Sequence, residues 1–313
     1  MNIDLIGVPL DFGADRRGVD MGPSAIRYAG LRRGLEALEH AVFDLGNVAV
    51  PLADTCYPGD LNVKYLDQIV DVGRRLATIV QGSVRAGHLP LVLGGDHSLS
   101  LGSVAGAARE QRLGVIWIDA HSDFNTPETT PSGNIHGMPL AVLLGHGDER
   151  LRTLGGVQHG DAKLDPRNVV LVGVRDIDDT ERALLEASGV HVFSMEMVDR
   201  LGMCATMEHA IARATANTDG LWLSLDLDSI DPMYAPGVGT PVAGGLSARE
   251  AHLAVELLAE TGLLVGMDVV EVNPILDSQN KTGAVAVELA LSACGKRIWR
   301  RDAYERLRGA LVA

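Results

Sequence analysis

The sequence predicts an α/β fold in which one three-layer domain has helices on both faces of a mainly parallel sheet. Short apolar runs recur along the whole 313-residue chain, and longer amphipathic stretches separate them. This alternation is typical of parallel strands joined by helices. Most of the runs are continuously apolar, as expected for strands that are covered on both faces. Because no repeat or linker interrupts the pattern, we expect a single domain over residues 1–313.

The apolar runs are the predicted strands, and the amphipathic stretches between them are the predicted helices. In chain order the strands are Ile3–Val8, Val42–Leu45, Leu89–Leu93, Gly114–Ile118, Val169–Val174, Val190–Phe193, Leu221–Leu227 and Leu263–Val272. The helices are Ser24–Glu39, Leu61–Ala86, Ser98–Arg112, Asp179–Ala187, Met203–Thr215, Ser247–Glu260 and Lys281–Ala293. Pro23 suits the first turn of its helix. Ser247 and Glu250 have the spacing of a capping box.

Two polar segments break the alternation. Residues 145–168 are predicted to form a surface loop. Residues 122–135 are dense in Ser, Thr, Asn, Pro and Gly, and they directly follow a strand with ionisable residues at its end. Since ligands bind at the carboxyl ends of parallel strands, we expect this second segment to form a wall of a binding site.

Composition excludes several classes of protein. The chain has 27 Lys and Arg against 41 Asp and Glu, a net charge of −14, which argues against binding to nucleic acids or anionic membranes. With 46% hydrophobic residues it is not a disordered chain. No apolar run is long enough to span a bilayer, and the N-terminus does not resemble a signal peptide. The three cysteines are far apart, which favours reduced thiols in a cytoplasmic protein.

Carboxylates and imidazoles gather at the ends of three predicted strands. Asp119, His121 and Asp123 alternate along one strand end, so their side chains point to the same side. Asp226 and Asp228 repeat this spacing, and His97 follows a third strand within GGDHS. Without a cation such a group would be mutually repulsive or unsatisfied. We therefore predict a metal site.

The ligand types favour Mn²⁺ over a structural zinc, because carboxylates and imidazoles occur without a thiolate. Four aspartates would balance two divalent cations, and a pair of ions can supply hydroxide near neutral pH. The sequence thus predicts two Mn²⁺ ions per subunit.

The sequence resembles the ureohydrolases, and among them the bacterial-type arginases, over almost the whole chain. Three motifs carry the resemblance: GGDHS at 94–98, DAHSDFNTPETTPSGNIHG at 119–137, and SLDLDSIDPMYAPGVGTPVAGG at 224–245. The ending GMDVVEVNPILDSQNKTG is similar as well. The family implies an eight-stranded parallel sheet, a binuclear manganese centre, and a homo-oligomer that is a trimer or a hexamer.

The resemblance also implies ligand sets and residue roles. One manganese would be held by His97, Asp119, Asp123 and Asp226, and the other by Asp119, His121, Asp226 and Asp228, with Asp119 and Asp226 bridging. His136 matches the proton-shuttling histidine, and an imidazole titrates in the right range for that role. Glu271 matches the carboxylate that holds the substrate guanidinium. Asp123 would also assist proton transfer.

The far end of the substrate is expected to meet a second group of residues. By resemblance, the α-carboxylate faces Asn125, Thr130, Ser132 and Asn134. Asp178 matches the residue that receives the α-amino group, Glu181 lies near it, and Thr240 shapes the pocket wall.

The sequence therefore predicts manganese-dependent hydrolysis of L-arginine to L-ornithine and urea, with attack by a hydroxide that bridges the two metals. The alternative enzyme is an agmatinase or another guanidino-compound ureohydrolase. A non-catalytic protein with the arginase fold is disfavoured, because all six family ligands are present. A metal-dependent phosphohydrolase would leave the APGVGTP and SGNIHG segments unexplained.

Overall fold

The computed structural model describes residues 1–156 and 162–299, which form an eight-stranded sheet with every pair of neighbouring strands parallel. The strand order is β2-β1-β3-β8-β7-β4-β5-β6. The strands are β1 (Asn2–Val8), β2 (Ala41–Asn47), β3 (Leu89–Gly94), β4 (Leu113–Ile118), β5 (Val169–Val174), β6 (His191–Ser194), β7 (Gly220–Asp226) and β8 (Leu264–Val270). All eight predicted strands are confirmed to within a few residues.

Helices connect the strands and cover the sheet. They are α1 (Gly22–Tyr28), α2 (Leu31–Ala37), α3 (Leu66–Arg85), α4 (Ser100–Ala108), α5 (Pro139–Leu143), α6 (Glu149–Arg152), α7 (Asp179–Ser188), α8 (Met195–Leu201), α9 (Met203–Ala214), α10 (Ala248–Glu260) and α11 (Lys281–Ala293). The capping box that opens α10 is confirmed, because Ser247 and Glu250 exchange side-chain-to-backbone hydrogen bonds.

Several boundaries differ from the prediction for local physical reasons. The helix expected over 24–39 is two helices, because the chain turns at Gly30 with a left-handed φ of 95°. The helix expected from Leu61 begins at Leu66, after Tyr65 adopts a left-handed φ of 55°. Strand β2 is largely exposed, since it is an edge strand and only β1 pairs with it.

The loop predicted over 145–168 also contains short helical turns. They are α6 and two 3-10 turns at Leu154–Gly156 and Pro166–Asn168. Residues 157–161 of this segment lie outside the described residues.

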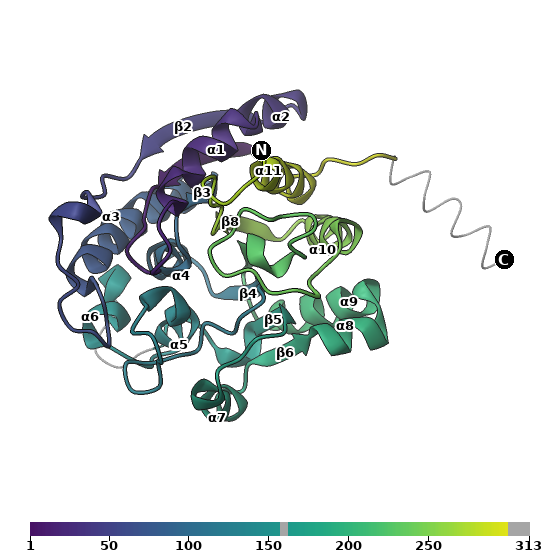
Figure 1. Cartoon of the computed structure of the whole chain (residues 1–313). Coiled ribbons are helices and arrows are strands. Elements are labelled where there is room, and N and C mark those ends of the chain that lie inside the picture. The colour runs from purple at the N-terminus through teal and green to yellow at the C-terminus, as the bar shows by residue number, and fades with distance from the viewer. Residues whose placement is uncertain (157–161, 300–313) are drawn as a thin grey trace.

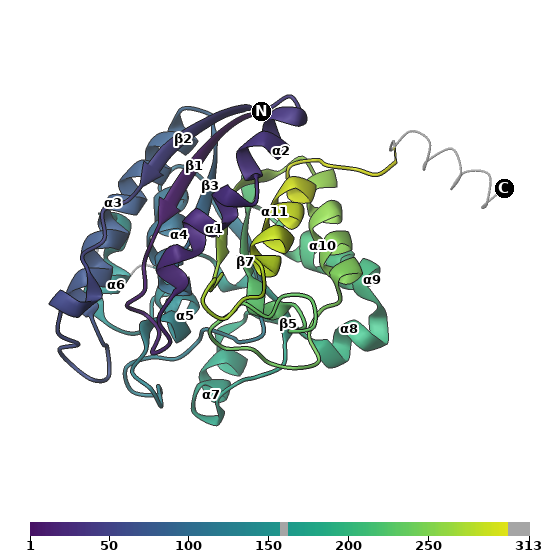
Figure 2. The ribbon, with the colours of Figure 1, turned by 45° about the horizontal axis from the view of Figure 1, so that its top comes forward.

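Two hydrophobic cores lie on opposite faces of the sheet. Residues of α1, α2, α9, α10 and α11 belong to one core, and residues of α3, α4 and α5 belong to the other. Strand β4 shows the alternation between them: Ile116 and Ile118 enter the first core, while Val115 and Trp117 enter the second. Figures 1 and 2 show the two helical layers with the strands between them.

This topology brings distant motifs to one edge. Strands β3, β8, β7 and β4 are adjacent in the sheet. Because they are parallel, the residues that follow their carboxyl ends meet at the same edge. Within the described residues, no helix has both the length and the apolar character needed to cross a membrane.

Candidate metal centre

A cavity of about 120 Å³ opens at the carboxyl edge of the sheet, and nearly all the predicted site residues line it. The predicted residues in its wall are His97, His121, Asp123, Asn125, Thr130, Ser132, Asn134, His136, Asp178, Glu181, Asp226, Asp228 and Thr240. Asp119 and Glu271 are buried behind the wall residues that they contact: Asp119 beside His97 and His121, and Glu271 beside His136. Asp176 and Gly137 complete the lining.

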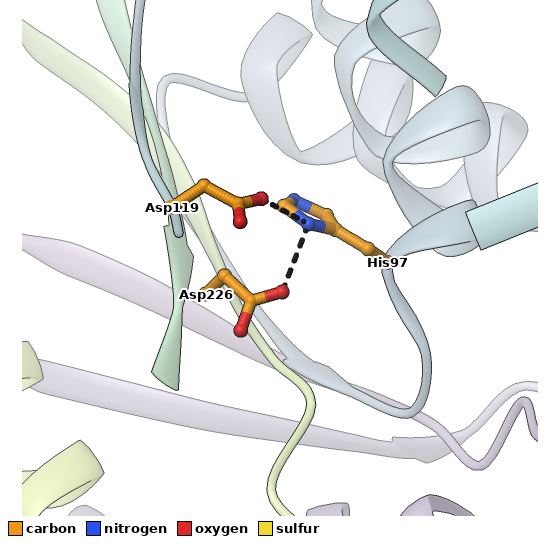
Figure 3. A group of neighbouring side chains, drawn as sticks. All are labelled: His97, Asp119 and Asp226. Atoms are coloured by element: carbon orange, nitrogen blue, oxygen red, sulfur yellow. Dashed lines mark ion pairs between the residues drawn. The ribbon is translucent and has the colours of Figure 1, made fainter. Parts of the chain in front are cut away.

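The imidazole of His97 lies among three carboxylates at the cavity floor. Its Nδ1 atom is 3.1 Å from Asp119 Oδ2, 3.0 Å from Asp123 Oδ2 and 3.1 Å from Asp226 Oδ2. Figure 3 shows His97 facing Asp119 and Asp226 from the end of a different strand. The indole of Trp117 stacks on the His97 ring and donates a hydrogen bond to Asp119. These contacts fix the ring and one carboxylate rigidly.

The hydrogen bonds behind His97 determine which of its nitrogens carries the proton. Ser224 donates its hydroxyl proton to Asp268, so its oxygen accepts from His97 Nε2 at 2.8 Å. In the neutral ring, Nδ1 then presents a lone pair to the carboxylates. His97 Nδ1 and Asp123 Oδ2 are both buried without a hydrogen-bond partner. A lone pair that meets carboxylate oxygens has the arrangement of a metal ligand.

A second group forms around His121. Its Nδ1 atom is 3.1 Å from Asp228 Oδ2 and 3.5 Å from Asp119 Oδ1. Thr240 donates a hydrogen bond to Asp228 Oδ2 at 2.9 Å, which orients that carboxylate. Asp119 thus belongs to both groups, as expected of a bridging ligand.

Electrostatics favour a cation in this cluster. Burial together with the neighbouring Asp119 raises the pKa of Asp123 to about 7. Burial, Asp228 and Asp119 raise the pKa of Asp226 well above its ordinary value. Burial opposes the charged form of His97, but the surrounding carboxylates outweigh it and raise the pKa of His97. Positive charge, whether a proton or a metal ion, therefore stabilises the group.

The residues fit a pair of divalent ions. Within His97–Asp119–Asp226, and within Asp119–His121–Asp228, the candidate ligand atoms all lie within 4.8 Å of one another. Ligands on opposite sides of one ion, at about 2.1 Å each, are roughly this far apart. Oxygen and imidazole donors without thiolate suit manganese. The double role predicted for Asp226 stays a prediction, because only the first group contains it.

Strained backbone occurs at two of these residues. Asp123 and Glu271 have left-handed φ angles of 50° and 63°. Residues other than glycine adopt such angles at a cost of about 1–3 kcal/mol, and they are concentrated at functional sites. The carbonyl of Asp123 accepts hydrogen bonds from Leu140 and Ala141 at the start of α5, which hold the turn.

His136 and Glu271 form a second buried pair beside the metal groups. His136 Nδ1 donates to Glu271 Oε1 at 3.1 Å, and the backbone N–H of His97 donates to the same oxygen. Burial opposes protonation of His136, but Glu271 raises its pKa to about 9. Glu271 Oε2 is buried without a hydrogen-bond partner. One carboxylate oxygen is thus available for a cationic group.

The loop over 122–135 presents hydrogen-bond donors to the cavity. The hydroxyl oxygen of Thr130 accepts from the backbone N–H of Gly133, and that of Ser132 accepts from Asn134. Because these oxygens act as acceptors within the loop, their O–H protons can be donated to a ligand. Asn125 uses one amide N–H for Asp178 Oδ2 at 2.8 Å, and its second N–H stays available.

Glu181 and Asp178 differ in what they contact. The two carboxylate oxygens of Glu181 accept from the backbone N–H groups of Asp178 and Phe124, each at 3.0 Å. Glu181 thereby joins the start of α7 to the loop. The carboxylate of Asp178 faces Asn125 and lines the cavity.

Sequence reasoning missed the residues that support the site from behind. Ser224 and Asp268 fix the ring of His97, and a lone Asp in the apolar run of β8 was the available signal. Arg175 donates to the carbonyls of Asp228, Ser229 and Val242, and so ties the end of β7 to the loop that carries Thr240. Hydrogen bonds to carbonyls leave no trace in the sequence.

Comparison with known proteins agrees with this geometry. Residues 1–295 match the arginase family. An arginase from Brevibacillus brevis is 51% identical over 298 residues, which cover 95% of this chain and 99% of that protein. The structure of the Bacillus caldovelox arginase is 50% identical with a TM-score of 0.92, covering 95% of this chain and 99% of that one. The Bacillus cereus arginase structure is 47% identical with a TM-score of 0.90, covering 96% and 100%. Because the family match covers residues 1–295 and these relatives are about half identical over 95% of its length, the chain belongs to the arginase family.

Proposed function

We propose that this protein hydrolyses L-arginine to L-ornithine and urea with two Mn²⁺ ions per subunit. The observation that carries the proposal is the layout of the cavity. Its floor carries the two groups of candidate metal ligands, its rim carries neutral donors beside the acid Asp178, and a buried carboxylate oxygen of Glu271 without a partner lies next to the lining residue His136. L-Arginine carries a guanidinium at one end and a carboxylate and an ammonium at the other. The guanidinium end of L-arginine would then meet Glu271, and its carboxylate and ammonium would meet the donors and the acid at the rim.

At the floor, His97, Asp119, Asp123 and Asp226 would hold one ion, and Asp119, His121, Asp226 and Asp228 the other. When bound, such a pair lowers the pKa of water and supplies a nucleophile near neutral pH. Asp123 has an oxygen without a partner at this point and would accept a proton or a hydrogen bond from that water. Glu271 Oε2 would receive the guanidinium and place its carbon over the floor.

His136 handles the proton that the leaving group requires. Hydrolysis breaks the bond between the guanidinium carbon and the δ-nitrogen, and the departing amine must gain a proton. Since Nδ1 of His136 is bound to Glu271, its Nε2 atom is the one that exchanges protons in the cavity. The partly exposed ring, at 17%, can then be reprotonated from solvent.

At the rim, the O–H groups of Thr130 and Ser132 and an N–H of Asn125 would donate to the α-carboxylate. Asp178 would accept a hydrogen bond from the α-ammonium. Glu181 accepts hydrogen bonds from the backbone of both Asp178 and Phe124, so it holds the start of α7 against the donor loop. A site with these polar groups disfavours agmatine, which has no carboxylate, because the donors would then be unpaired.

Steady-state urea release from L-arginine and agmatine tests the proposal. We expect kcat/KM for L-arginine to exceed that for agmatine by about 10⁴ in the Mn²⁺-loaded protein. Comparable values would reject the arginase assignment while leaving a ureohydrolase. Absence of urea from both substrates would reject the proposal altogether.

The domain organisation and the oligomeric state of the protein stay predictions. The proposed single domain over 1–313 is supported by the one sheet that the described residues share. The proposed trimer or hexamer is tested by light scattering of the purified protein.

A further inference from the structure

The substrate cavity is strongly acidic. Six of the residues in its wall are carboxylates, and none is Lys or Arg. Two divalent ions would balance the four aspartates of the metal groups, but Asp176, Asp178 and Glu181 also line the cavity. A substrate carboxylate that enters this rim is repelled unless positive charge lies near the donor loop.

Lys64 brings a positive charge to the back of that loop. Its Nζ atom is 3.1 Å from the amide oxygen of Asn134 and 2.8 Å from Asp15 Oδ1. The side chain is 20% exposed, whereas that of Asp15 is 66% exposed. Because solvent screens the more exposed acid more than the half-buried amine, the pair keeps a positive end toward the loop. Arg16 lines the outer part of the mouth, where it is exposed and screened in the same way.

The same lysine also fixes the orientation of the Asn134 side chain. An ammonium can only donate, so it selects the amide oxygen, and the amide nitrogen is turned the other way. The carboxylate of Asp15 interacts with the Asn134 amide, and Lys64 and Asn134 together lower the pKa of Asp15. The Asn134 amide is thus held between a cation and an anion.

Backbone contacts tie Lys64 directly to the loop. Its N–H donates to the carbonyl of Gly133 at 3.0 Å. Gly133 has a φ of +74°, and a Cβ atom there would lie 1.7 Å from the carbonyl oxygen of Leu61. The segment over 61–64 and the loop over 130–134 therefore touch backbone to backbone at Gly133.

We propose that Lys64 is a positioning residue that sets specificity for a carboxylate-bearing substrate, by holding the Asn134 side chain and the Thr130–Asn134 loop and by adding positive charge behind them. This inference rests on the proposed function. It adds a residue that contacts the substrate-facing loop from outside the cavity wall.

Three variants of the Mn²⁺-loaded protein test it. Lys64→Met removes the charge and keeps most of the length, and Lys64→Arg keeps the charge. Lys296→Met is the matched control, because it removes the same charge from an exposed pair with Glu288 outside the cavity wall. Thermal unfolding of each variant shows whether it is folded at the assay temperature.

For Lys64→Met we expect KM for L-arginine to rise about tenfold while kcat changes little, because a hydrogen-bonded charge is lost at the binding end only. The inhibition constant of L-ornithine should rise by a similar factor, and that of 1,4-diaminobutane, which has no carboxylate, should not. Lys64→Arg should restore most of the affinity, and Lys296→Met should behave as the unmodified protein.

Equal losses for ligands with and without a carboxylate, or a fall in kcat alone, would overturn the role of Lys64 while leaving arginine hydrolysis intact. Unchanged kinetics in a folded Lys64→Met protein would overturn it as well. If the unmodified protein released no urea from L-arginine, the proposed function would fail first, and the inference with it.

Discussion

Replacing Asp178 by Asn removes one negative charge from the substrate cavity and keeps the shape of the side chain. Asn125 can still donate to the new amide oxygen, so the 2.8 Å hydrogen bond that closes this corner survives. Asp178 is also the N-cap residue of α7, and Asn suits that position equally well, so we expect the loss at the proposed contact with the substrate ammonium. Hydrogen bonds to charged groups contribute about 1–2 kcal/mol more than neutral ones, so kcat/KM for L-arginine should fall roughly 5- to 30-fold.

Glu181→Gln is the matched comparison, because its effect should be on stability. Both oxygens of Glu181 accept backbone N–H groups, and Gln offers only one oxygen. One buried N–H is left without an acceptor, at a cost of about 1–3 kcal/mol. The melting temperature should fall by roughly 2–4 °C per kcal/mol. Urea-release kinetics and thermal unfolding of both variants measure the difference.

Kinetic constants of Asp178→Asn equal to those of the unmodified protein would show that Asp178 does not contact the substrate ammonium. A melting temperature of Asp178→Asn as low as that of Glu181→Gln would show that Asp178 is a structural residue.

Three further outcomes follow from the geometry. His136→Asn should lower kcat by about 10²–10⁴ and leave the metal content unchanged, as measured by elemental analysis and kinetics; unchanged turnover would remove His136 from proton transfer. Asp226→Asn should bind fewer than two ions per chain yet keep its circular dichroism, because a core of this size does not depend on metal; two tightly bound ions would contradict its ligand role. Burial raises the pKa of Cys294 to about 12, so the reactive thiolate forms only as the pH approaches that value. At pH 8 iodoacetamide should label the exposed Cys204 but reach Cys294 only after unfolding, and mass spectrometry that found Cys294 labelled in the folded protein would show the burial to be wrong.

The strands could be predicted well because burial imposes a continuous apolar run. Strand β5 has all six residues buried, and its observed bounds equal the predicted ones. The helix boundaries were less predictable, since Gly30 and Tyr65 adopt left-handed angles that no periodic pattern reveals. Strand β2 was assigned correctly, but its exposure depends on its edge position, which only the strand order determines.

Most cavity residues could be predicted because they lie within three motifs, each at the end of one strand, while Asp178 and Glu181 follow a fourth strand, β5. Their supports could not, because these come from elsewhere in the chain. Asp268 acts on His97 through Ser224, and Lys64 reaches Asn134 across 70 positions of sequence. Such contacts depend on the packing of separate elements, and the residues that make them look like ordinary polar or charged residues.

Titrating the metal-stripped protein with Mn²⁺ while measuring urea released from L-arginine shows whether hydrolysis depends on two metal ions. We expect no urea without metal, and activity that rises and saturates at two Mn²⁺ ions per chain. Urea released at full rate by the stripped protein in the presence of a chelator would contradict the proposed role of the metal ions. A fully loaded protein that leaves L-arginine intact would contradict the proposed function.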